Sequence, residues 1–155
     1  MQELWAALAG EFSDFPDLKQ AVSLGFRLAL AVVLAGLLGY ERERRDAPAG
    51  LRTHMMVGLG AALFVLVPQQ TGVVAADMTR VLQGVVAGIG FLGAGAILKS
   101  GDRGEVSGLT TAASIWTTAA IGVAAGLGKA FTAIAATGLA LLILAAVLQF
   151  EKRIK

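Results

Sequence analysis

Apolar residues form five long runs along the chain, and charged residues fall mostly between these runs. A helix that crosses a membrane needs about 20 mostly apolar residues, with about 17 as the lower limit. The runs span residues 21–40, 51–67, 81–98, 108–127 and 130–149, and each meets that length. The three prolines, at positions 16, 48 and 68, lie outside the runs. The pattern therefore predicts an all-α, polytopic membrane bundle with about five transmembrane helices.

The composition favours the same class of protein. Of the 155 residues, 56% are hydrophobic, only 15% are charged and 20 are glycine. Soluble domains carry about 25% charged residues and about 7% glycine, so this chain has too few charges for a water-facing surface. Disordered chains are poor in hydrophobic residues, which excludes that class too. The chain has no cysteine, and therefore no disulfide framework, thiolate metal site or cysteine nucleophile.

The distribution of lysine and arginine predicts the orientation, because basic residues concentrate in cytoplasmic loops. With the N-terminus outside and the C-terminus inside, nine basic residues lie inside and three lie outside. The inner residues are Arg42, Arg44, Arg45, Arg52, Lys99, Arg103, Lys152, Arg153 and Lys155, and the outer ones are Lys19, Arg80 and Lys129. We therefore expect an acidic, amphipathic segment (1–20), a transmembrane domain (21–150) and a basic cytoplasmic tail (151–155). The first segment forms a short surface helix or a frayed tail.

Glycines recur at the spacing of helix contact faces in the third and fourth runs. Helices in a membrane approach one another closely through small residues. The residues concerned are Gly84, Gly88, Gly90, Gly93, Gly95, Gly122 and Gly126. Residues 88–93 also match the dinucleotide expression GxGxxG, but that site needs a strand before it and a helix after it. Because the match lies inside an apolar run, we interpret these glycines as helix contacts, within one chain or between two.

One arginine lies inside the first apolar run. Arg27 is about six residues from the outer end of the run, which at about 1.5 Å per residue is a depth of roughly 9 Å. Its side chain either extends outward to the surface or pairs inside the bundle as a functional group. Asp77 is the only acidic residue in an outer loop, and it stands close to Arg80 in sequence. We therefore expect Asp77 as the partner in any such pair.

The inner loop after the first run holds the densest group of ionisable residues. Glu41 and Arg45 are four residues apart, as are Arg42 and Asp46, so both pairs can form on one helix surface. An anchor that contacts lipid phosphates would explain these charges. The polar run nevertheless continues through Arg52, Thr53 and His54 into the second apolar run, where its members need partners. The sequence therefore predicts a functional cluster of Glu41, Arg42, Arg52, Thr53 and His54.

The fourth run carries hydroxyl side chains at spacings that gather on one helix face. They are Thr110, Thr111, Ser114, Thr117 and Thr118. Such hydroxyls bond to carbonyls and neighbouring helices, or they line a polar pathway. No aspartate or glutamate occurs in 47–76, 78–101 or 106–150, whereas magnesium is normally held through one or two carboxylates. We expect no metal site, cofactor or catalytic residue, and no enzymatic activity.

Three segments carry long, ordered motifs. They read RLALAVVLAGLLGYERERRDAPAGLRTHMMVGLGAALF (27–64), DMTRVLQGVVAGIGFLGAGAIL (77–98) and GLTTAASIWTTAAIG (108–122). Together they resemble the MgtC/SapB family of bacterial inner-membrane proteins. The resemblance assigns as motif residues Arg27, Gly39, Glu41, Arg42, Gly50, Leu51, Arg52, Thr53, His54, Arg80, the glycines of 88–95, residues 108–111 and Trp116.

This resemblance implies a multi-pass protein of the bacterial inner membrane with about five helices. Many family members add a soluble C-terminal domain, and because the chain ends at Lys155 we expect either a short member or a longer protein cut at that boundary. The family is associated with growth in low magnesium, survival within host cells and modulation of the F-type ATP synthase, and its members are often named magnesium transporters. We expect a non-enzymatic modulator of another membrane complex, with transport of magnesium or another small solute as the alternative. The partners expected are the lipid bilayer and another membrane protein, with a homodimer left open, and no nucleic acid.

Overall fold

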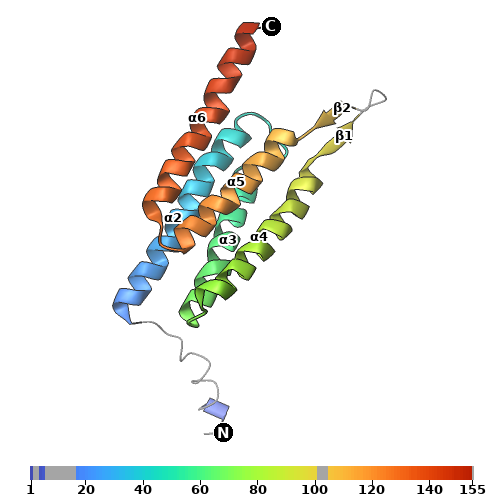
Figure 1. The fold of residues 1–155 in the computed structure, drawn as a ribbon. Helices are drawn as coiled ribbons and strands as arrows, with labels where there is room; N and C mark the ends of the chain where they lie inside the picture. Colours follow the sequence, from blue (N-terminus) through green and yellow to red (C-terminus); the bar gives the residue numbers. More distant parts are fainter. Residues whose placement is uncertain (2–3, 6–16, 101–104, 155) are drawn as a thin grey trace.

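The computed structural model describes residues 1, 4–5, 17–100 and 105–154. Five long helices run alternately up and down, so that α2 begins at one end of the bundle and α6 ends at the other (Figure 1). Their bounds are α2 (Leu18–Glu43), α3 (Leu51–Gln70), α4 (Ala75–Ala96), α5 (Leu109–Gly126) and α6 (Ala130–Ile154). The predicted all-α bundle is confirmed. The acidic N-terminal segment lies largely outside the described residues.

Four of these helices are long and apolar enough to cross a membrane. They are α2, α3, α4 (as Ala76–Ala96) and α5, whereas the apolar part of α6 with described side chains, Ala130–Ala145, is shorter. This protein is accordingly a helical membrane protein. The orientation with the N-terminus outside stays a prediction.

Several helix ends differ from the predicted runs, and local chemistry explains two of them. α3 continues past Pro68 to Gln70: the ring removes the one amide that would bond to the Phe64 carbonyl, and only two helical residues follow it. The Pro68 carbonyl there accepts hydrogen bonds from the Thr71 hydroxyl at 2.9 Å and from the Val73 amide at 3.2 Å. α4 ends at Ala96, two residues before the predicted end, because Leu98 enters a strand.

A short hairpin that the sequence did not predict joins α4 to α5. Strand β1 (Leu98–Ser100) pairs antiparallel with β2 (Glu105–Ser107), with Leu98 opposite Ser107. Gly108 follows with φ +88°, and a Cβ at this position would lie 2.0 Å from the Ala96 carbonyl oxygen. Only glycine fits this turn, since it has no Cβ and tolerates positive φ. The three-residue strands carry no hydrophobic alternation that a sequence could reveal.

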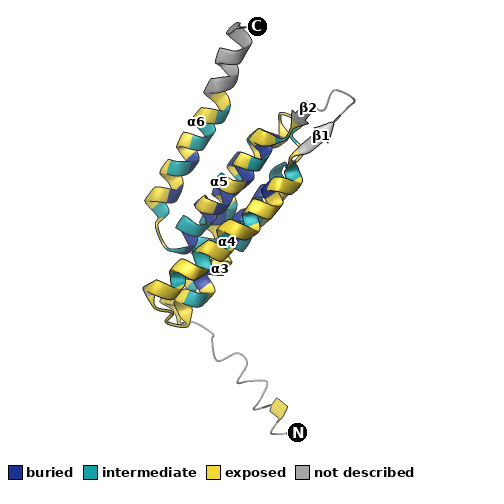
Figure 2. Cartoon of the chain, turned by 45° about the vertical axis from the view of Figure 1, so that its right-hand side comes forward, coloured by how far each residue is buried: buried dark blue, intermediate teal, exposed yellow. Residues whose placement is uncertain are grey.

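The core centres on α5, which contacts each of the four other long helices. Ile115, Ala119, Ile121 and Ala125 of α5 are buried, and Figure 2 shows dark blue concentrated on this helix. By contrast, α4 lies on the outside of the bundle, and none of its most apolar 18-residue window is buried. Its open surface is therefore free to face lipid or another protein.

Candidate functional site

The end of the bundle where α2 ends and α3 begins is called the arginine-rich end, because Arg42, Arg44, Arg45 and Arg52 lie there. α2 and α3 approach to backbone contact at this end. A Cβ on Gly39 would lie 2.8 Å from Leu51 Cα and 2.9 Å from His54 Cβ. A side chain at position 39 would thus separate the helices, which explains the glycine of the motif.

Glu43 caps the start of α3 from the last turn of α2. Its Oε2 accepts a hydrogen bond from the Leu51 amide at 2.7 Å. The first amides of a helix have no intrahelical partner, so this carboxylate satisfies one of them and also lies at the positive end of the helix dipole. Sequence reasoning missed this role, because the acceptor comes from another helix. Glu43 lies eight residues before Leu51, outside any capping-box spacing.

His54 of α3 is fully buried, and its ring faces α5. Its Nδ1 lies 2.8 Å from the Gly50 carbonyl oxygen, and its Nε2 lies 3.1 Å from Ser114 Oγ. A carbonyl only accepts, so Nδ1 carries a proton and donates it, while Nε2 faces the Ser114 hydroxyl. Ser114 Oγ also lies 2.8 Å from the Thr111 carbonyl oxygen. The histidine therefore ties the start of α3 to α5.

The charged side chains beside this histidine are partly buried. Arg42 is 8% exposed, and its guanidinium lies 3.7 Å from Glu41 Oε2, while Glu41 Oε1 accepts from Arg45. The predicted Glu41–Arg45 pair is present. The predicted Arg42–Asp46 pair is replaced by Arg42–Glu41, because α2 ends at Glu43 and Asp46 has φ 53°. Among the described residues, Arg42 Nε and Glu41 Oε2 are buried without a hydrogen-bond partner.

The structure divides the cluster predicted at 41–54 into an inner and an outer part. Arg42 and His54 are buried and Glu41 is half-buried, whereas Arg52 and Thr53 are exposed on the first turn of α3. Successive residues of a helix point about 100° apart, so neighbours in sequence need not share a face. The buried part forms a polar junction of α2, α3 and α5.

The hydroxyls of α5 are divided in the same way. Thr111, Ser114 and Thr118 are buried, and Thr118 Oγ1 has no hydrogen-bond partner among the described residues. Thr110 is exposed, and Thr117 Oγ1 donates to the Ala113 carbonyl at 2.9 Å. These five side chains therefore do not line one continuous path.

Arg27 binds the ends of two other helices at the opposite end of the bundle. Its Nη1 donates to Gln69 Oε1 at 3.0 Å and to the Gly126 carbonyl at 3.2 Å. Carbonyls at a helix C-terminus carry partial negative charge, so they attract a guanidinium. A Cβ at Gly128 would lie 2.9 Å from Arg27 Nη2, so this glycine leaves room for the side chain.

The predicted pairing of Arg27 with Asp77 is wrong. Asp77 instead accepts from Arg80 at 3.1 Å, three residues along the first turns of α4, and both side chains are exposed. Sequence reasoning missed both acceptors of Arg27. One is the neutral side chain of Gln69, and the other is the backbone carbonyl of Gly126, which the residue type does not reveal. Arg27 is thus half-buried at this end of the bundle and is held there by neutral groups.

The glycines fall into two groups, those at which two helices touch and those with open space around them. A Cβ at Gly122 would lie 2.4 Å from the Gly58 carbonyl oxygen, and one at Gly126 would lie 2.6 Å from that of Ala62, so α3 and α5 touch at these points. A Cβ at Gly93 would lie 3.7 Å from the Cβ of Ala112, which is an ordinary contact. At four other positions of α4 a Cβ would meet nothing within 4 Å: Gly84, Gly88, Gly90 and Gly95. All of 88–93 lies inside α4, with no strand before it among the described residues.

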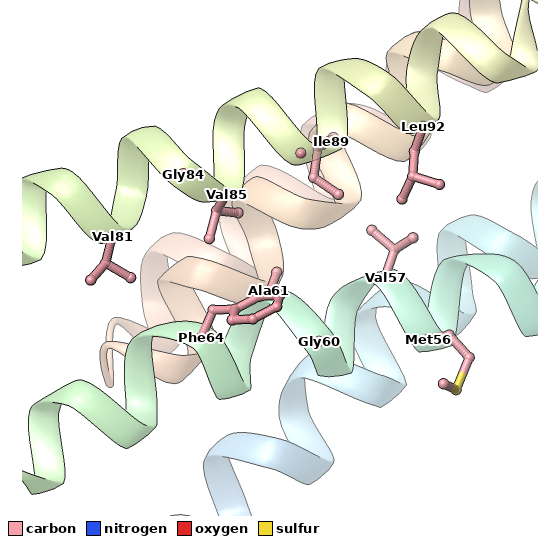
Figure 3. A pocket seen from close by; sticks show the side chains of 11 residues that line it. Met56, Val57, Gly60, Ala61, Phe64, Val81, Gly84, Val85, Ile89 and Leu92 are labelled. Carbon is pink, nitrogen blue, oxygen red and sulfur yellow. The ribbon is translucent and has the colours of Figure 1, made fainter.

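A groove of about 560 Å³ separates α4 from α3. Figure 3 shows Val81, Val85 and Leu92 of α4 pointing toward α3, with Val57 and Phe64 of α3 pointing back. The walls also include Gly60, Gly84 and Gly88, none of which has a neighbour within 4 Å of a Cβ position. The groove is thus apolar, shallow-walled and open along two membrane-spanning helices.

A protein-family model matches most of the chain, the arginine-rich end included. The model of the MgtC family matches residues 28–153. The chain belongs to the MgtC family. The resemblance seen in the three sequence segments is thereby confirmed, and no solved structure matches the chain significantly.

Curated relatives of this MgtC-family chain are bacterial proteins. Protein SrpB of Synechococcus elongatus is 48% identical over 69% of this chain and 65% of its own length. Protein MgtC of Brucella abortus is 48% identical over 71% of this chain and 45% of its own length. YhiD of Escherichia coli, which is named as a putative magnesium transporter, is 45% identical over 66% of this chain and 50% of its own length. The chain therefore spans about half to two thirds of these relatives.

Proposed function

We propose that this MgtC-family chain is a non-enzymatic protein of the bacterial inner membrane that modulates another membrane complex by direct helix contact. The observation that carries the proposal is the open surface of α4. A 22-residue apolar helix has four glycines with free space around them and a groove of about 560 Å³ beside it. In a membrane, small residues let a partner helix approach closely, so this surface suits a transmembrane helix.

The F-type ATP synthase is the proposed partner, in connection with magnesium limitation and virulence. The resemblance to the MgtC/SapB family suggested this complex, and its membrane sector offers transmembrane helices for contact. The names of the MgtC relatives agree with the family role but say nothing of a partner. On this proposal α4 and the groove form the contact surface, while the buried junction of Glu41, Arg42 and His54 holds the three supporting helices in place.

Magnesium transport is the alternative that the name of YhiD raises. The hydroxyls of α5 were the expected lining of a path. Ser114 and Thr117 are instead engaged with groups of this chain, Ser114 with His54 and the Thr111 carbonyl, and Thr117 with the Ala113 carbonyl. These contacts support modulation over transport.

The test uses glycine positions that have equal space within the chain. Gly84→Leu and Gly88→Leu fill the groove side of α4, and Gly138→Leu is the matched control on α6, where a Cβ also meets nothing within 4 Å. We expect the parent chain and the control to co-purify with the F-type ATP synthase and to change ATP-driven proton pumping in inverted membrane vesicles. The two α4 variants are expected to lose both effects while remaining folded.

Two results would overturn the proposal. The first is that the parent chain neither changes proton pumping nor captures the synthase. The other is saturable magnesium flux into liposomes that contain only the purified chain, abolished by Ser114→Ala, which would favour transport.

A further inference from the structure

A second pocket lies at the arginine-rich end, on the surface between α2 and α6. Its volume is about 420 Å³, within the range of about 300–1,000 Å³ that small-ligand sites occupy. It is lined by Leu37, Tyr40, Glu41, Arg44, Arg45 and Leu141. The two leucines belong to membrane-spanning runs, whereas the other four lie in the last turns of α2 and just after it. The pocket is thus apolar on its membrane side and cationic at its rim.

The charged rim has more positive than negative groups. Arg45 is paired with Glu41, which also lies 3.7 Å from Arg42, so the single carboxylate is already engaged. The Arg44 guanidinium carbon lies 5.8 Å from the centroid of the Tyr40 ring. A cation within about 6 Å of an aromatic ring is attracted to the face of that ring, and this attraction uses none of the guanidinium N–H donors. Arg44 is therefore oriented and still able to donate.

The pocket opens on the outer surface of the bundle rather than toward the helix core. Leu37 is 47% exposed and Tyr40 is 58% exposed, on consecutive turns of α2. Tyrosine favours the membrane interface, where its ring is apolar and its hydroxyl reaches water. Basic residues at this depth attract anionic lipids, and guanidinium groups match the geometry of phosphate oxygens.

We propose that this pocket binds the phosphate group of an anionic phospholipid. Arg44 and Arg45 hold the phosphate oxygens, the Tyr40 hydroxyl lies beside the headgroup, and an acyl chain follows Leu37 and Leu141 toward the membrane interior. Glu41 keeps Arg45 in place through their ion pair. Free inorganic phosphate carries the same charged group, but it has no acyl chain to contact the two leucines.

The test is native mass spectrometry of the purified full chain in detergent, titrated with phosphatidylglycerol, with phosphatidylcholine, or with inorganic phosphate. Arg44→Gln is compared with Arg80→Gln, which removes the same charge from an exposed arginine at the other end of the bundle. We expect the parent and Arg80→Gln to retain phosphatidylglycerol in preference to phosphatidylcholine. Arg44→Gln is expected to weaken that retention about tenfold, with unchanged helix content by circular dichroism.

A variant of the apolar wall distinguishes the two sources of phosphate. Leu37→Gln is expected to weaken binding of phosphatidylglycerol while leaving any weak binding of inorganic phosphate as it was. Equal loss of phosphatidylglycerol in Arg44→Gln and Arg80→Gln would overturn the site, because it would show attraction by overall charge alone. So would equal retention of the anionic and zwitterionic lipids, or binding of inorganic phosphate as tight as that of lipid.

Discussion

The contact between α3 and α5 allows the sharpest test of how this bundle is held together. Gly122→Ala adds one methyl group at a point where its Cβ would lie 2.4 Å from the Gly58 carbonyl oxygen and 3.0 Å from Gly58 Cα. Ordinary van der Waals contact begins at 3.4 Å, so the two backbones must separate by about 1 Å. The neighbouring atoms belong to the backbone and cannot rotate away, as a flexible side chain would.

The expected cost follows from two opposing effects. Overpacking of a tight contact costs about 1–3 kcal/mol. Replacing glycine by alanine inside a helix stabilises it by about 0.5–1 kcal/mol. Gly60→Ala on α3 carries the second effect without the first, because a Cβ there meets nothing within 4 Å. Relative to Gly60→Ala, we therefore expect Gly122→Ala to lower the free energy of unfolding by about 1–3 kcal/mol.

The measurement is unfolding of the purified chain by titration with sodium dodecyl sulfate, followed by circular dichroism and by the fluorescence of Trp116. This tryptophan lies on α5, about 1.7 turns from Gly122, and is half exposed, so it reports separation of α5 from its neighbours. Equal midpoints for the Gly122→Ala and Gly60→Ala variants would refute the close approach of α3 and α5. A destabilised Gly60→Ala variant would show that a methyl group disturbs α3 even where the structure leaves room.

Three further contacts and the orientation lead to predictions of their own. Ser114→Ala leaves the buried imidazole nitrogen without its partner, so the same titration should show a loss of about 1–3 kcal/mol, and an unchanged midpoint would contradict the hydrogen bond. Arg27→Gln removes a charged donor from the C-terminus of α5 and should cost about 1.5–3 kcal/mol, more than any effect of Lys19→Gln on the exposed first turn of α2. Glu43→Ala uncaps α3 and should cost about 0.5–2 kcal/mol, with faster hydrogen exchange in the first turn of that helix as the check. Single cysteines at Arg52 and Lys129 should react with an impermeant maleimide only from the cytoplasmic and only from the outer side, respectively, and the reverse labelling would contradict the predicted orientation.

The positions of the helices were predictable because each apolar run is long and bounded by charges. The predicted runs begin or end within a few residues of the observed helices, and the largest difference is the start of α4 at Ala75 rather than at residue 81. The six additional residues at the start of α4 include Asp77 and Arg80, and a search for apolar runs rejects charged residues. In the structure they form an i,i+3 pair on the exposed first turns of the helix. The hairpin escaped prediction because its pairing depends on the path of the chain after α4.

The composition of the candidate site was only partly predictable. His54 and Arg42 stood out in the sequence as polar groups at the edge of apolar runs, and both are buried. Their partners did not stand out. Ser114 lies 60 residues away from His54, and the backbone carbonyls of Gly50 and Gly126 have no sequence signature at all. Arg52, which the sequence analysis counted as a member of the cluster, is exposed because its position on α3 faces outward.

The sequence by itself determined the class of protein, the approximate helices and the family, because apolar length, scarcity of charge and ordered motifs act locally along the chain. Only the tertiary structure decided which glycines are contacts. Gly122 and Gly126 press against α3, while Gly84 and Gly88 have the same four-residue spacing and face open space. The physical reason is that a glycine permits close approach but supplies no attraction of its own. Whether a helix comes near depends on how the neighbouring helices pack, and in this bundle α5 lies at the centre and α4 at the edge.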